Sequence, residues 1–173
     1  MKKEILAISI VLLMLCGCKK NVGDTMDNNE ITEIVNMMNN YETSIKNYDF
    51  EVSDYYWINP EDNMYVSVIN FTDDSIELEV CKEIYVEKLD FQISDIKVDG
   101  NTATANCDVQ ICVIGEFITK IPELYDHDEL MKKDKEELKK EFQKQLEEYT
   151  EIWENGTVYF EKIGENWKIK SIE

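Results

Sequence analysis

Two kinds of side chain in this sequence are suited to nucleophilic chemistry, the cysteine thiols and one imidazole. The chain has five cysteines, at positions Cys16, Cys18, Cys81, Cys107 and Cys112. A catalytic thiol needs a neighbouring base, and the only histidine is His127. None of the local motifs of thiol enzymes is present, and no Cys–His pair is evident from the spacing. His127 lies in the polar segment Tyr125–Asp128, which favours a solvated or helix-capping role, so we predict no catalytic residue.

The cysteines beyond the N-terminus are better explained by packing than by disulfides. Cys107 and Cys112 fall on one predicted strand, and their odd separation places them on opposite faces, where they cannot bridge. A bond between Cys81 and Cys107 is the one internal pairing that we consider. We favour the interpretation that all three thiols are unpaired, because cysteine is commonly buried as a small apolar residue.

The two N-terminal cysteines lie at the end of a segment that predicts an export signal. Two lysines precede an apolar run from Ile5 to Leu15, which is shorter than the roughly 20 residues that a membrane-spanning helix needs. The run ends in Leu15-Cys16-Gly17-Cys18, which resembles the lipobox of bacterial lipoproteins. This resemblance implies a thioether-linked diacylglycerol on Cys18 and cleavage of the signal between Gly17 and Cys18. Cys16, in the tolerant middle position, would leave with the signal.

The expected organisation is a signal peptide over 1–17, a lipidated cysteine with a flexible tether over 18–29, and one domain over 30–173. The expected location is the extracytoplasmic side of the cell membrane, with the lipid as anchor. Two acyl chains hold a protein stably on a membrane, whereas one chain binds only marginally. A stable anchor is needed here, because removal of residues 1–17 changes the formal charge from -19 to -20 and an anionic membrane surface repels such a chain.

The composition excludes some partners. All 18 basic residues are lysines, so no arginine offers the bidentate fork that recognises phosphate. Nucleic acid is excluded as a partner, because its binding requires cationic side chains that displace counterions. No carboxylate loop of the EF-hand type is present, and we predict no metal site and no cofactor.

The first half of the domain shows helical periodicity. Apolar residues at helical spacing predict an amphipathic helix over 30–48. Asn59-Pro60-Glu61 is typical of the start of a second helix. The β-branched residues within Tyr65–Ile69 also fit a strand, and we favour the helix. A turn at Thr72–Asp74 is followed by a third helix from Ile76 to Leu89 that carries Cys81.

From Asp90 the periodicity changes to two. Asp99-Gly100 lies between two strand-like runs and predicts a hairpin, and the apolar phase slips near Ser94-Asp95, which predicts a β-bulge. The second strand should bury one face, namely Ala103, Ala105, Cys107, Val109, Ile111 and Val113.

A long charged helix over 129–153 is expected next, with an inner stripe of Met131, Leu138, Phe142, Leu146, Tyr149 and Trp153. A last hairpin joins 157–162 to 166–171 through Gly164-Glu165, with Val158, Phe160, Trp167 and Ile169 facing the core.

Helices, a curved antiparallel sheet and a long helix before the C-terminal hairpin form an α+β order. The runs Ile93–Ala105 and Val158–Ile169 resemble the NTF2-like (cystatin-like) domain superfamily, in particular its lipoprotein branches of unknown function. The resemblance implies a cone whose mouth holds a small molecule. An aromatic pocket could include Tyr41, Tyr48, Tyr55 and Trp57, with His127 nearby, although Tyr41 and Tyr48 also fit plain core positions.

Three hypotheses for function are compatible with these features. The leading one is a non-enzymatic, membrane-anchored module that binds a small ligand or a neighbouring protein through its cone or sheet face. The second is a ketosteroid isomerase-like or polyketide cyclase-like enzyme with an Asp and a Tyr in the cone, which requires a perturbed carboxylate at the base of an apolar pocket. The third is an assembly role for the outer sheet face, with Cys112 and Ile114 meeting another subunit.

Overall fold

The structure is a computed structural model that describes residues 24–70 and 75–173. The predicted export signal with its predicted lipobox, the rest of residues 18–23 and the predicted turn at 72–74 lie outside the described residues. Within the described ranges, no helix has both the length and the apolar character needed to cross a membrane.

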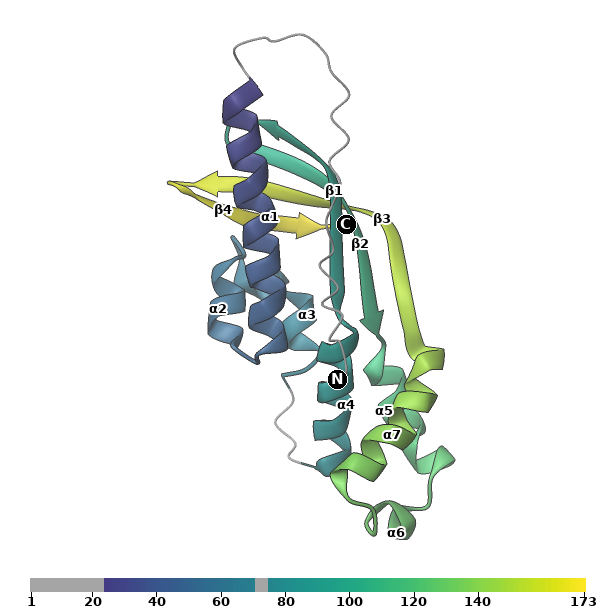
Figure 1. Ribbon diagram of the computed structural model, residues 1–173. Coiled ribbons are helices and arrows are strands. Elements are labelled where there is room, and N and C mark those ends of the chain that lie inside the picture. Colours follow the sequence, from purple (N-terminus) through teal and green to yellow (C-terminus); the bar gives the residue numbers. More distant parts are fainter. Residues whose placement is uncertain (1–23, 71–74) are drawn as a thin grey trace, which may run out of the picture.

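The fold is α+β, as predicted: helices are followed by a curved four-stranded antiparallel sheet that ends in a hairpin, an arrangement compatible with a cone-like fold. Helix α1 (Asp24–Lys46) lies across the sheet (Figure 1). Of its predicted apolar residues, Ile31 and Val35 are half-buried, and the buried ones are Ile34, Met38, Tyr41 and Ile45. The prediction of a flexible tether up to residue 29 is wrong for 24–29, which are helical. No glycine or proline follows Gly23 in this stretch, and extending an existing helix is far easier than starting one.

The next segment is a series of short helices, of which the Asn59-Pro60 signal indicated only the part that follows Asn59. They are α2 (Phe50–Tyr55), the 3-10 turn η1 (Pro60–Asp62) and α3 (Met64–Ser67). The strand alternative for Tyr65–Ile69 is excluded. Helix α4 (Ile76–Lys88) confirms the third predicted helix and begins where the Ser75 hydroxyl accepts the Leu78 N–H.

The sheet has the order β1-β2-β3-β4, with β1 (Asp90–Asp99), β2 (Thr102–Cys112), β3 (Thr150–Ile163) and β4 (Asn166–Ile172). The β1–β2 turn places Gly100 at φ 60°, a conformation that glycine adopts without steric cost. The predicted bulge is confirmed, because the β1–β2 register shifts between Ser94 and Lys97 and Asp95 has φ 50°. The core-facing residues of β2 and of the last hairpin are buried as predicted, except Val113, which lies beyond β2 and is half-buried.

The helix predicted over 129–153 is wrong in its extent. The chain here contains α5 (Ile114–Leu124), α6 (His127–Leu130), α7 (Lys135–Leu146) and η2 (Glu147–Tyr149). The Asp134 side chain accepts the Glu137 N–H and the Glu137 side chain accepts the Asp134 N–H, a capping box that starts a new helix. Met131 is 62% exposed, and Trp153 belongs to β3.

Helices α4 and α7 run side by side in the same direction, joined by lysine–glutamate pairs. Lys135 Nζ lies 2.6 Å from carboxylate oxygens of both Glu79 and Glu83, and Lys139 Nζ lies 3.0 Å from Glu83 and 2.6 Å from Glu87. The hydrogen bond from Lys135 is the main cause that lowers the pKa of Glu83. These partly exposed pairs contribute little stability each, and they join successive turns of the two helices.

The three cysteines among the described residues are free and buried, which confirms the prediction of unpaired thiols and excludes the Cys81–Cys107 bond. Cys112 and Ile114 are fully buried too. The Cys112 thiol donates to the Leu146 carbonyl at the end of α7, with 3.8 Å between sulfur and oxygen. The prediction that Cys112 and Ile114 lie on an outer face is therefore wrong, because α5 and α7 cover that end of the sheet.

Candidate functional site

The space between the helices and the sheet is filled by aromatic side chains. The Tyr41 ring lies 6.2 Å from Trp57 and 5.5 Å from Phe91, and Phe91 lies 4.9 Å from Tyr65. The buried Tyr41 hydroxyl donates to Asn63 Oδ1 at 2.7 Å, and burial raises its pKa strongly. Tyr41 and Trp57 are thus brought together as predicted, but as core rather than as the walls of a pocket.

The other predicted pocket residues lie apart from this cluster. Tyr48 is 43% exposed and packs edge-on against Phe50 at 6.2 Å. It fits neither the predicted pocket nor the alternative core position, because α1 ends at Lys46 and Tyr48 takes φ 58°. His127 is exposed in the first turn of α6, which lies at the bottom end of the molecule in Figure 1, away from α2.

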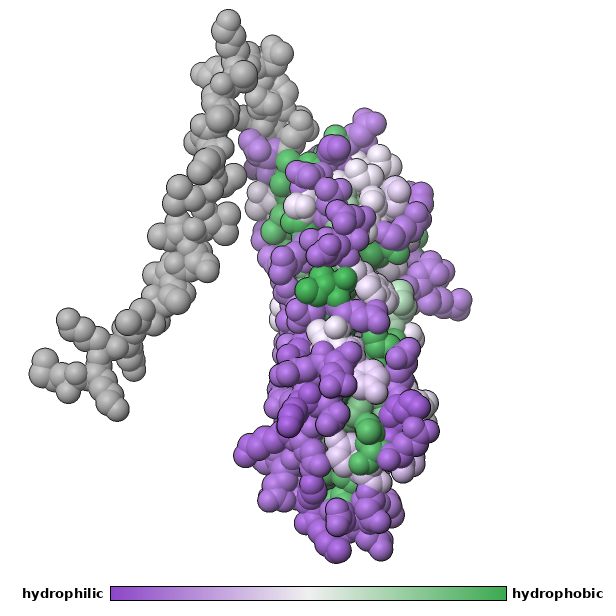
Figure 2. Space-filling view, turned by 90° about the vertical axis from the view of Figure 1, so that its right-hand side faces the viewer, coloured by the Kyte–Doolittle hydropathy of each residue, from purple (hydrophilic) through white to green (hydrophobic). Residues whose placement is uncertain are grey.

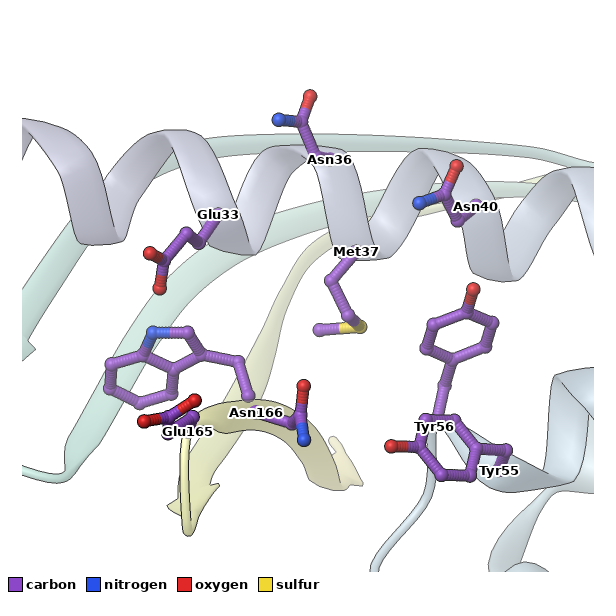
Figure 3. Close-up of a pocket in the computed structure, with 9 residues that line it drawn as sticks. Glu33, Asn36, Met37, Asn40, Tyr55, Tyr56, Glu165 and Asn166 are labelled. Atoms are coloured by element: carbon purple, nitrogen blue, oxygen red, sulfur yellow. The ribbon is translucent and has the colours of Figure 1, made fainter.

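A polar cleft of about 380 Å³ opens beside the aromatic core (Figure 3). Helix α1, helix α2 with the residue after it, and the β3–β4 turn form its walls. The residues that line this polar cleft are Glu33, Asn36, Met37, Asn40, Tyr55, Tyr56, Glu165, Asn166 and Trp167. Figure 3 shows Glu33 and Met37 directed from α1 toward the turn, whereas Asn36 points away from it.

Backbone pairing holds the two tyrosines against β4. The Ile169 N–H donates to the Tyr56 carbonyl at 2.7 Å, and the Ile58 N–H donates to the Ile169 carbonyl at 2.9 Å. The Lys168 ammonium lies 3.7 Å from the centroid of the Tyr55 ring and donates to the Tyr55 carbonyl. These contacts hold one wall of the cleft in place without help from a ligand.

The opposite wall is built around Trp167, whose indole N–H is buried and has no hydrogen-bond partner among the described residues. The Lys162 ammonium lies 5.5 Å from the centroid of this ring and pairs with Glu30 at 3.0 Å and Glu33 at 3.6 Å. A buried donor without an acceptor costs free energy and calls for an explanation such as a water or a bound group. The Trp167 N–H is thus a buried donor behind the cleft wall that no described residue satisfies.

The electrostatics of the polar cleft favour neutral or cationic groups. Its lining includes the carboxylates of Glu33 and Glu165 and no lysine. The amides of Asn40 and Asn166 can both donate and accept. The sequence pattern indicated Tyr55 as a pocket residue but did not indicate Glu33, Asn36 and Asn40 of α1. These three residues lie on the exposed, polar side of the helix, whereas the sequence prediction rested on the apolar side.

A second concavity lies on the core side of β2 and β3. Two adjoining hollows of about 390 and 220 Å³ share Met64, Tyr65 and Trp153, and we call them together the apolar groove. The smaller hollow is almost entirely apolar and has no carboxylate in its lining. The pKa of Glu83 is lowered rather than raised, and this residue pairs with lysines of α7 instead of lining the smaller hollow. The perturbed carboxylate that the enzyme hypothesis requires is therefore not found at the base of this hollow.

Comparison with known protein families, curated proteins and solved structures finds no match to this chain. A function for the domain must therefore be inferred from the geometry of the polar cleft and of the sheet.

Proposed function

We propose that this chain is a lipoprotein, anchored on the extracytoplasmic side of the membrane through Cys18, whose NTF2-like domain binds a small hydroxylated molecule in the polar cleft. One observation carries the ligand class: the cleft combines two carboxylates and amides with aromatic walls, and its lining has no cationic side chain.

Hydroxyl groups fit this lining because each both donates and accepts hydrogen bonds. They donate to the carboxylates of Glu33 and Glu165 and accept from the Asn166 amide. Aromatic faces such as Tyr56 pack against the apolar C–H side of such a ligand. An anionic ligand is disfavoured, because the lining holds two carboxylates and no lysine, and the neighbouring Lys162 pairs only with Glu33 of the two. A neutral sugar is the simplest member of the favoured class.

The ligand proposal is tested by thermal shift and calorimetry with neutral sugars, with glucuronate as the anionic comparison, and by mass spectrometry of molecules retained after gentle purification. We expect a neutral sugar to raise the melting temperature and glucuronate not to do so. Asn166→Ala should weaken binding by about tenfold, which corresponds to one lost hydrogen bond. The matched control Asn106→Ala removes an exposed amide from β2, outside the cleft lining, and should leave affinity unchanged. Equal binding of glucuronate, or none by any sugar, would contradict the proposal.

The anchor is tested by metabolic labelling with a radioactive or clickable fatty acid. Cys18→Ala should abolish the label and leave the signal uncut or the protein released, because the thioether needs that sulfur. Cys16→Ala is the matched control and should keep the label, since Cys16 stands at the tolerant position of the motif. Continued labelling of Cys18→Ala would refute the assignment.

A further inference from the structure

Half of strand β3 lacks a neighbour on one side among the described strands. Its register with β2 extends from Thr150 to Glu161, whereas its register with β4 covers only Val158–Ile163. Beyond β4, Glu173 still pairs with Thr157 through two backbone hydrogen bonds of 2.7 and 3.0 Å. The segment 150–156 of β3 therefore forms an open sheet edge in line with β4, visible on the lower right of the sheet in Figure 1.

One hydrogen bond indicates which backbone N–H and C=O groups of this open edge point toward β2 and which point away. The Val113 N–H donates to the Tyr149 carbonyl at 2.8 Å, which makes these two residues a hydrogen-bonded pair. In an antiparallel ladder such pairs alternate, so Glu151 and Trp153 also face β2. The N–H and C=O of Ile152 consequently point away from β2, and among the described residues no strand or side chain pairs with them.

The two sides of the open edge differ in chemistry. On the core side lies the apolar groove, where Met64 and Trp153 remain 45% and 40% exposed. Its larger hollow also includes Glu173 and Glu154, and Glu154 lines the hollow on the outer side as well. On the outer side lies a hollow of about 210 Å³ that we call the acidic hollow. Its lining consists of Asp90, Gln92, Asp108, Gln110, Ile152 and Glu154, without a lysine. Figure 2, which looks at this side of the molecule, shows a broken band of hydrophobic residues between hydrophilic margins.

We propose that the open edge of β3 binds an extended peptide segment of a partner protein, in which apolar and basic residues alternate. A strand added beside Ile152 continues the line of β4 and satisfies the free backbone groups. Successive side chains of a strand point to opposite faces, so one set enters the apolar groove and the other reaches the carboxylates of the acidic hollow. This site is separate from the polar cleft and does not depend on its ligand.

Charge argues against a second copy of this chain as the occupant. An antiparallel pairing of two β3 edges would bring the acidic hollows of both copies together, with Glu154 and Asp108 of each facing like charges. The formal charge of -19 adds a general repulsion between copies. A basic partner removes both penalties.

The probe is a blocked peptide of alternating lysine and valine, long enough to cover residues 150–156, and the comparison peptide replaces each lysine with glutamate. Both are titrated into the chain carrying Cys18→Ser, with amide hydrogen exchange as the readout. We expect the lysine peptide alone to bind and to slow exchange at Ile152. Protection elsewhere, equal binding of both peptides, or a doubled mass of the free protein would overturn the proposal.

Two variants localise the site. Ile152→Pro removes the outward N–H but no β2–β3 hydrogen bond, and proline is tolerated at such edge positions; it should weaken the lysine peptide by about tenfold or more. Glu154→Lys keeps the backbone and should shift preference toward the glutamate peptide. Glu136→Lys on α7 makes the same charge change away from the edge and should leave preference unchanged. If Ile152→Pro fails to fold, Glu154→Lys still decides: an unchanged preference overturns the proposal.

Discussion

Phe142→Ala should lower the free energy of unfolding by about 3–5 kcal/mol, as measured by urea denaturation, because it leaves a cavity in the core between α5 and α7. Phe142 is fully buried on α7. Its ring lies 5.1 Å from Phe117 on α5 and 5.5 Å from Tyr125, so one truncation removes contacts that join two helices and the loop after α5.

Two controls make this result specific. Lys140→Ala on the exposed face of the same helix should change stability by no more than about 0.5 kcal/mol. Met131→Ala should do the same, because Met131 is 62% exposed. If the chain formed one continuous helix over 129–153 with Met131 on its inner stripe, both Met131→Ala and Phe142→Ala would lower the free energy of unfolding strongly. A large decrease for Met131→Ala would therefore contradict the structure.

Alkaline conditions should destabilise the protein steeply above about pH 9, where unperturbed lysines are still protonated. Burial raises the pKa of Cys81 and of Cys107 to about 12 and that of Cys112 to about 11, from 9.0. A group whose pKa is raised on folding contributes stability that is complete below its unfolded pKa and is lost as the pH rises through the folded pKa. Each thiol should therefore cost about 1.4 kcal/mol per pH unit above about pH 9.

The measurement is the free energy of unfolding between about pH 7 and pH 11 by urea denaturation under reducing conditions. We expect a flat profile to about pH 9 followed by a steep fall. Cys107→Ala should be less steep between about pH 9 and pH 10.5, because it has one fewer thiol to deprotonate, although it is less stable at neutral pH. A profile that falls equally steeply without Cys107 would show that the thiol is accessible and titrates in the folded state.

Local chemistry determined much of the sheet. Asp99-Gly100 and Gly164-Glu165 marked both hairpin turns because each turn needs a residue that tolerates positive φ, which glycine does. The phase slip at Ser94-Asp95 marked the bulge because side chains alternate with a period of two. Such features depend on neighbours in the chain, so the sequence alone reveals them.

The boundary between α7 and β3 depended on tertiary structure. Leu146, Tyr149 and Trp153 have spacing that a helix accepts, yet Trp153 pairs with Val109 of β2. A run of residues compatible with either state takes the one that its neighbours stabilise, and here an open edge of β2 was available. The same pairing left part of β3 without a second partner among the described strands and so created the proposed peptide site.

The candidate sites show the same division. The sequence alone indicated the lipobox at Cys18, which stays a prediction, and the aromatic residues near Tyr41 and Trp57, which the structure places in the core. The polar cleft joins Glu33 to Glu165 and Asn166, far apart in the chain. No local pattern encodes such a meeting, because it arises only when α1 packs across the β3–β4 hairpin. The sequence therefore determined turns, strand faces and buried thiols, while the packing of helices on the sheet decided which polar residues share a cleft.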